Sequence, residues 1–282
     1  MERWTAGKIL TSTVTVLFIA AMALFAVYPV VYALLGSLKT NMELTLGGTF
    51  LPAKPMFQNY IDAFQKAKFI LYSINSVVLS VMTTVLALIT SSLAGYVVAR
   101  HQFVGKKLLM SLYLGLMFVS LGAVSLYPQY ILMYQLGLTG NLLGLAIVLT
   151  GGQAANVFLI MGFTKSIPKE LDESAFMDGC SPFQIYRTIL LPLIKPILAV
   201  VALFTFRSTW NDYITSLIFT MSRPELKPLT VAVVSLRYST NAAAELNIMT
   251  AGASIALLPI LIVYLLANKQ FISGLTAGAI KG

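Results

Sequence analysis

A polar segment between residues 165 and 195 carries a dense group of acidic side chains in an otherwise apolar chain. The protein has ten acidic residues, and the segment contains four of them: Glu170, Asp172, Glu173 and Asp178. Carboxylates at this density can form ion pairs and charge-assisted hydrogen bonds with the basic side chains of a partner. We therefore expect this segment to lie outside the bilayer, either as a solvated loop or as a surface that binds another protein.

The positions of Pro, Gly and Ser in the segment predict a helix, a sharp turn and a second helix. Pro168 suits the first turn of a helix, where its missing N–H is not needed. Gly179 is typical of a helix end in the left-handed conformation. Ser181 and Pro182 predict the cap and the first turn of a second helix. The carboxylates of the first helix would then remain available to solvent or to a partner.

The composition of the whole chain predicts an all-α polytopic membrane protein. Hydrophobic residues make up 58% of the chain and charged residues 10%, and the mean hydropathy is +0.84, values that exclude a soluble domain. Apolar segments long enough for helices of about 20 residues indicate one transmembrane domain over 1–282 with six transmembrane helices. The predicted spans are 9–36, 70–98, 108–133, 142–163, 197–220 and 250–269.

Topology follows from the charges at the ends of these spans. Lys and Arg are more numerous on the segments that share a face with the termini, which predicts that both termini and the 165–195 loop are cytoplasmic. The first span is interpreted as a retained helix and not as a cleaved signal peptide, because the apolar run continues past the cleavage-like Ala21–Ala23. The net charge is +9, but the Lys and Arg residues that give it are scattered at helix ends. The bilayer, and not nucleic acid, is therefore the expected partner.

No residue pattern in the chain indicates catalysis. A phosphate-binding GxxxxGK[ST] loop is absent, because Lys8 is followed by Ile9 and Lys106 by Lys107. Cys180 is the single cysteine and can form neither a disulfide nor a paired metal site within one chain. We therefore predict a protein that is not an enzyme, with no catalytic, cofactor-binding or metal-binding residues.

Three motifs resemble those of a known family, and together with the span pattern they cover nearly the whole chain. The run Glu173-Ser174-Ala175, with Asp178-Gly179 and Ile189-Leu190-Leu191-Pro192 after it, resembles the EAA loop of ABC importer permeases, although Ser174 departs from the usual alanine. The C-terminal run 270–282 and Trp210-Asn211-Asp212-Tyr213 resemble the corresponding parts of MalG-type permeases of carbohydrate importers.

The resemblance implies a type I ABC importer architecture, with loop 165–195 as a cytoplasmic coupling helix docked on an ATP-binding subunit. The implied coupling residues are Glu173, Ser174, Ala175, Asp178, Gly179, Ile189 and Pro192. The C-terminal tail, 270–282, would reach between the ATPase subunits, and its implied contact residues are Gly274, Gly278, Lys281 and Gly282.

The same resemblance implies the partners and the location of the complex. The chain would form a heterodimer with a MalF-type second permease in a prokaryotic cytoplasmic membrane. Two ATP-binding subunits would hold the ATP and Mg, since this chain is expected to hold no cofactor. An extracytoplasmic sugar-binding protein would deliver the sugar to be imported.

Polar residues within the spans are candidates for the sugar path, because polar side chains are costly in lipid and usually face protein or water. The candidates are Asn75, Gln153, Asn156 and Asn211. Hydrogen bonding between helices is the more common role of such residues. A secondary carrier driven by an ion gradient is the alternative function, since Arg207 and Asp212 lie inside a span. We see no internal repeat of the kind that many carriers have.

Overall fold

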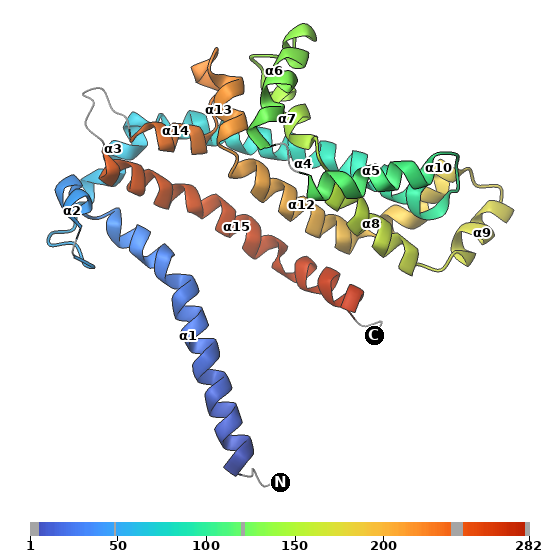
Figure 1. Cartoon of the computed structure of the whole chain (residues 1–282), viewed down its shortest axis with the longest axis horizontal. Helices are drawn as coiled ribbons and strands as arrows, with labels where there is room; N and C mark the ends of the chain where they lie inside the picture. Colours follow the sequence, from blue (N-terminus) through green and yellow to red (C-terminus); the bar gives the residue numbers. More distant parts are fainter. Residues whose placement is uncertain (1–5, 48, 120–121, 238–244, 280–282) are drawn as a thin grey trace. The chain divides into compact units, whose positions relative to one another are not determined.

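The computed structural model describes residues 6–47, 49–119, 122–237 and 245–279, and these contain helices but no strand (Figure 1). The side chains are described over residues 11–265 of these ranges. The elements, with η1 and η3 as 3-10 helices and η2 as a π-helix, are α1 (Ala6–Gly36), α2 (Asn41–Leu46), α3 (Gln58–Lys66), α4 (Phe69–Arg100), α5 (Lys106–Phe118), η1 (Gly122–Ser125), α6 (Leu126–Gln135), α7 (Leu142–Thr150), α8 (Ala154–Ser166), α9 (Glu170–Met177), α10 (Pro182–Ile185), η2 (Tyr186–Leu190), α11 (Leu191–Leu193), α12 (Lys195–Trp210), α13 (Ile214–Thr220), η3 (Pro224–Leu226), α14 (Leu229–Ser235) and α15 (Leu246–Ala279).

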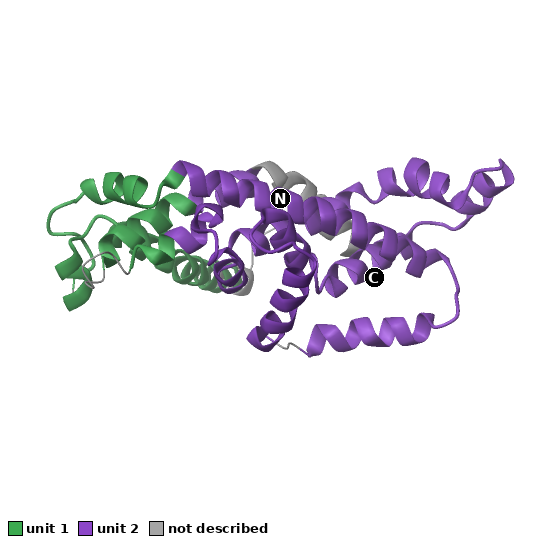
Figure 2. Ribbon diagram, turned by 90° about the horizontal axis from the view of Figure 1, so that it is seen from above, with its two compact units in different colours: residues 1–69, 233–256 green, residues 70–232, 257–282 purple. Residues whose placement is uncertain are grey.

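The chain forms two compact units, which are coloured separately in Figure 2. The first unit contains Met1–Phe69 and Val233–Ala256, and the second contains Ile70–Ala232 and Leu257–Gly282. The segment that carries the acidic side chains lies wholly in the second unit. Its surroundings within that unit therefore decide what the acidic side chains can contact.

Three of the described helices are long and apolar enough to cross a membrane: α1, α4 and the part of α15 up to Leu265. Two further pairs of helices meet the same requirement if each bent pair is one crossing. These pairs are α7 with α8, bent by 59°, and 182–193 with α12, bent by 78°. The side chains of α1 are largely exposed, as for Phe25 at 78%, which suits contact with lipid or with another subunit.

The helices differ from the predicted spans in several places, so six crossings stay a prediction. The predicted span 108–133 corresponds to α5 and α6, helices of 13 and 10 residues that are each too short to cross a bilayer. The predicted span 197–220 is divided between α12 and α13. The last predicted span ends at 269, whereas α15 continues through the predicted tail to Ala279.

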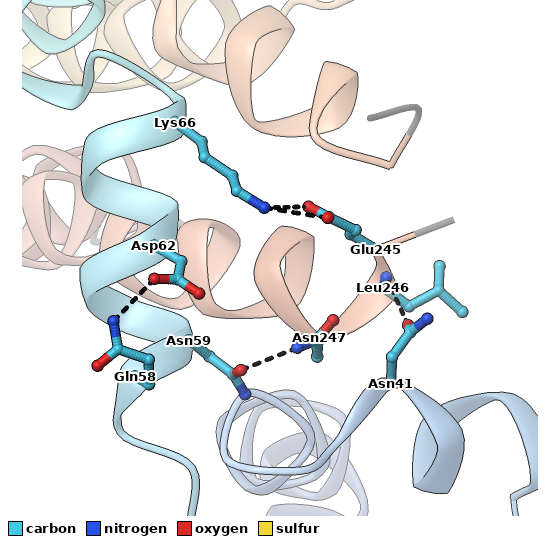
Figure 3. A network of polar contacts seen from close by, with 8 residues as sticks. All are labelled: Asn41, Gln58, Asn59, Asp62, Lys66, Glu245, Leu246 and Asn247. Atoms are coloured by element: carbon cyan, nitrogen blue, oxygen red, sulfur yellow. Dashed lines mark hydrogen bonds and ion pairs between the residues drawn. The ribbon is translucent and has the colours of Figure 1, made fainter. Parts of the chain in front are cut away.

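The first unit contains a polar network that joins α3 to the beginning of α15 (Figure 3). Asn59 is buried, and its Nδ2 donates to the carbonyls of Ser37 and Lys39, each at 2.8 Å, while its Oδ1 accepts from Asn247 Nδ2 at 2.8 Å. Lys66 Nζ lies 2.7 Å from Glu245 Oε2. Because buried polar groups need hydrogen-bond partners, this network fixes the segment between α1 and α4 against α15 within the unit.

The second unit has an apolar core beside the acidic segment, built from α4, α8, η2 and α12. Tyr96, Ile160, Tyr186, Leu190 and Val201 are among its buried members. The α4 and α8 helices approach closely here, because a Cβ added at position 95 would lie 2.7 Å from the Cγ2 atom of Ile160 and 3.2 Å from the backbone nitrogen of Met161. Gly95 therefore allows the close packing that small residues provide between membrane helices.

Candidate functional site

The first helix of the acidic segment, α9, ends in the turn that the sequence predicts. Gly179 has a φ of +83°, its N–H donates to the carbonyl of Phe176, and the N–H of Cys180 donates to the carbonyl of Ala175, each at 3.0 Å. These two bonds form a Schellman motif, in which glycine best tolerates the left-handed conformation. Gly179 therefore sets the direction in which the chain leaves α9.

The second helix begins at the predicted cap and then changes its winding. Ser181 and Gln184 form a capping box, with Pro182 in the first turn of α10. The π-helix η2 follows and contains Ile189, and the short α11 contains Pro192. π-helical turns are rare in proteins overall, but those that occur are often found at functional sites. The segment thus has a local backbone feature at Ile189 that its sequence did not predict.

The outer surface of α9 combines an acidic side chain with exposed apolar ones. Glu173 is exposed, and its carboxylate makes no hydrogen bond or ion pair with any residue in the described ranges. Phe176 and Met177 are 65% and 85% exposed. All three line a hollow of about 520 Å³. An exposed apolar patch with an adjacent free charge is typical of a surface that binds another protein.

Three other predicted coupling residues lie within α9 or at its end. Ser174 Oγ donates to the carbonyl of Glu170 at 2.7 Å, so a serine fits this position without an unpaired hydroxyl. Ala175 is 6% exposed and packs toward the protein. Asp178 is exposed at the C-terminal end of α9.

The structure adds an ion pair that sequence reasoning missed. Arg100, the last residue of α4, lies with its Nε atom 2.7 Å from Oδ2 of Asp172 in α9. The Arg100 and Asp172 side chains are only 4% and 18% exposed. In the sequence Arg100 follows a long apolar run, a position that indicates topology but not a partner.

Two of the predicted path residues, Gln153 and Asn156, line a cavity of about 380 Å³. Asn156 Nδ2 donates to Gln153 Oε1 and, at 3.3 Å, to Oγ1 of Thr205 in α12. The cavity lies at the bend between α7 and α8, where Gly152 has a φ of +74°. Its lining combines amides, hydroxyls, a carboxylate and an aromatic ring, and consists of Leu149, Gly151, Gly152, Gln153, Ala155, Asn156, Leu159, Phe204, Thr205, Ser208, Thr209 and Asp212.

The other two path candidates lie elsewhere. Asn75 is buried and donates to the carbonyls of Glu225 at 2.8 Å and Lys227 at 3.1 Å, so it fixes the segment after α13. Asn211 donates to the carbonyl of Arg207 at 2.9 Å and lines a neighbouring hollow of about 350 Å³, which shares Phe204 and Ser208 with the cavity. The cavity lining therefore includes two of the four candidates.

The predicted tail is partly described. Gly274 and Gly278 lie within α15, whereas Lys281 and Gly282 lie outside the described residues. Within those residues, no group of three His, Cys, Asp or Glu side chains is placed to hold a metal ion.

The described helices, several of which are long and apolar enough to cross a membrane, define a polytopic membrane protein. A family model described as "Binding-protein-dependent transport system inner membrane component" matches residues 91–275. The chain belongs to this family. It is a non-catalytic permease subunit of an ABC transporter, which confirms the predicted class.

Curated relatives support the same family over nearly the full length. The chain is 34% identical over 272 residues to the arabinooligosaccharides transport system permease protein AraQ of Bacillus subtilis (strain 168), with 94% of each chain covered. It is 30% identical over 279 residues to the melibiose/raffinose/stachyose import permease protein MelC of the same organism, with 98% of this chain and 99% of that protein covered.

The fold is similar to that of a solved importer. A chain in the crystal structure of a bacterial ABC transporter involved in the import of the acidic polysaccharide alginate matches with a TM-score of 0.77 and 25% sequence identity. The match covers 96% of this chain and 100% of that one. The predicted all-α permease architecture is thereby confirmed.

Proposed function

We propose that the chain is the MalG-type permease of a carbohydrate importer and forms the translocation path with a MalF-type second permease. The relatives' names include oligosaccharides of arabinose and the sugars melibiose, raffinose and stachyose, which supports a sugar as cargo. An extracytoplasmic sugar-binding protein delivers the cargo. Two ATP-binding subunits hold the ATP and Mg that drive import across a prokaryotic cytoplasmic membrane.

The observation that carries this proposal is the exposed surface of α9. Glu173 has no partner among the described residues and lies beside the exposed Phe176 and Met177. We propose that this surface docks on an ATP-binding subunit, with Glu173 paired to a basic residue there. Both termini and the 165–195 loop are then cytoplasmic, and the tail from Gly274 to Gly282 reaches the same subunits.

We further propose that the cavity beside the α7–α8 bend forms part of the sugar path. Its Asn156 amide and Thr205 hydroxyl offer hydrogen bonds, and Phe204 offers an aromatic surface. Sugars present hydroxyl groups and apolar faces, and binding sites typically combine a few placed polar groups with aromatic side chains.

Filling this cavity is expected to reduce sugar uptake by about tenfold or more, which corresponds to about 1.4 kcal/mol or more of lost interaction. Ser208 is exposed and lines the cavity, so Ser208→Trp places an indole in it. Uptake of labelled sugar and assembly with the ATPase would be measured together. Ser12→Trp, at an exposed serine of α1 that lines none of the hollows named above, is the control. Normal uptake by Ser208→Trp would exclude the cavity from the path.

The energy source tests the whole proposal against the alternative of an ion-driven carrier. The chain would be expressed with its neighbouring transport genes and assayed for co-purification of an ATPase subunit, then for uptake in the presence of an ionophore. We expect the ATPase to co-purify, and uptake to continue without an ion gradient while ATP is high. Uptake that collapses with the gradient at high ATP would contradict the proposal and favour the carrier.

A further inference from the structure

One face of α4 contacts the 165–195 loop at three successive levels. Ser92, Tyr96 and Arg100 are spaced by four residues, so they lie on the same side of the helix. Each makes a contact with the loop through its side chain. Neither the family's EAA motif nor the predicted coupling residues include any of the three.

The contact at Arg100 is a partly buried ion pair supported by a backbone contact. Its Nε atom lies 2.7 Å from Asp172 Oδ2, and its Nη2 atom donates to the carbonyl of Pro168 at 3.4 Å. The loop is therefore held both within α9 and immediately before it. Removing one member of a buried ion pair is costly, because the other charge is left buried without compensation.

The two other contacts hold the loop after α9. Tyr96 Oη donates to the carbonyl of Pro182 at 3.3 Å, and its ring centroid lies 5.5 Å from that of Tyr186. Ser92 Oγ and Tyr186 Oη share a hydrogen bond of 2.7 Å. The loop is thus fixed to α4 before, within and after α9, in addition to its covalent links to α8 and α12.

The same helix also lies near the bend between α7 and α8, which borders the proposed sugar cavity. Thr90, Ser91 and Ala94 of α4 line a hollow of about 350 Å³ together with residues 151–153. Residues 151–153 also line the cavity of about 380 Å³ at the α7–α8 bend, which we propose as part of the sugar path. The α4 helix also packs closely on α8, where a Cβ at Gly95 would lie 2.7 Å from Ile160 Cγ2, so we expect a displacement of α4 to move α8 and the bend that borders the cavity.

We propose that the Ser92–Tyr96–Arg100 face of α4, through its ion pair with Asp172, transmits movement of α9 to α4 and so to the α7–α8 bend. This inference rests on the proposed docking of α9 on an ATP-binding subunit. Arg100 and Asp172 are positioning residues in this scheme, because they contact neither ATP nor sugar. In this scheme Glu173 docks α9 on the ATP-binding subunit, and the Arg100–Asp172 pair transmits the movement of α9 to α4.

The test compares Arg100→Asp, Asp172→Arg and the charge-swapped double variant in the assembled transporter. The measurements are co-purification of the ATPase subunits and the amount of sugar transported per ATP hydrolysed. We expect each single variant to assemble and to hydrolyse ATP, with about tenfold less sugar transported per ATP, and the double variant to recover about half of the loss. Arg187→Asp makes the same change at an exposed arginine of the same loop and should keep the normal ratio.

Each outcome separates this inference from the proposed function. An unchanged ratio in assembled Arg100→Asp overturns the inference alone, whereas failure of the ATPase to join the unmodified chain overturns the docking of α9. A double variant that couples no better than the single ones also overturns the inference. If the single variants do not accumulate, the inference is tested by the ratio of sugar transported to ATP hydrolysed in the charge-swapped variant and in Tyr96→Phe. Tyr96→Phe keeps the ring and should lower the ratio about twofold, and an unchanged ratio in both would overturn the inference.

Discussion

Replacing Gly144 with leucine is expected to prevent accumulation of folded permease. Gly144 lies in the first turn of α7, and a Cβ at this position would lie 1.9 Å from the carbonyl oxygen of Leu138. The same turn is capped by Asn141, whose side chain accepts from the Gly144 N–H at 2.7 Å. A side chain therefore forces both the backbone at Leu138 and the helix cap to move, at a cost of about 3 kcal/mol or more.

The measurement is the amount of monodisperse protein extracted from membranes, together with its thermal unfolding midpoint. Gly115→Leu is the matched control, because Gly115 is also a helical glycine and a Cβ there meets nothing within 4 Å. We expect the control to resemble the unmodified protein. Normal yield and an unchanged midpoint for Gly144→Leu would show that the close contact with Leu138 is not required.

The shape of the 165–195 loop could be predicted because it depends on local chemistry. The left-handed conformation at Gly179 and the capping box at Ser181 each involve residues within a few positions of one another. Their sequence signals are therefore specific. The same reasoning predicted that Glu173 remains available to a partner, and it is exposed.

Contacts between distant segments could not be predicted in this way. Arg100 and Asp172 are far apart in the sequence, and nothing local to either residue indicates their pairing. Hydropathy identifies the apolar stretches but does not report bends, so the bend between α7 and α8 was not predicted. Asn75 and Asn156 have the same side chain, and only the fold distinguishes an amide bound to backbone carbonyls from one that lines a cavity.

Reversing the charge of Glu173 is expected to abolish coupled uptake. Glu173 is exposed, lines the hollow beside α9 and has no partner in the described part of the chain. Its backbone N–H is bonded to the carbonyl of Lys169 within the helix, and the substitution Glu173→Arg removes no side-chain contact with the described residues. At a docking surface, an arginine opposite a basic partner residue replaces attraction with repulsion, and like charges across an interface are strongly unfavourable. We expect co-purification of the ATPase to fall by about tenfold or more, and sugar uptake to fall with it.

Glu170→Arg is the control that separates docking from the charge of α9 as a whole. Glu170 lies in the first turn of the same helix and is also exposed, but it does not line the hollow. Both variants change the net charge equally, and both place a basic residue near the N-terminal end of the helix, where it slightly weakens the helix. A loss of ATPase binding in Glu173→Arg alone would therefore assign docking to the surface around the hollow. Equal losses in both variants would instead indicate that the negative charge of α9 acts without a specific pairing at Glu173, which would contradict its proposed role.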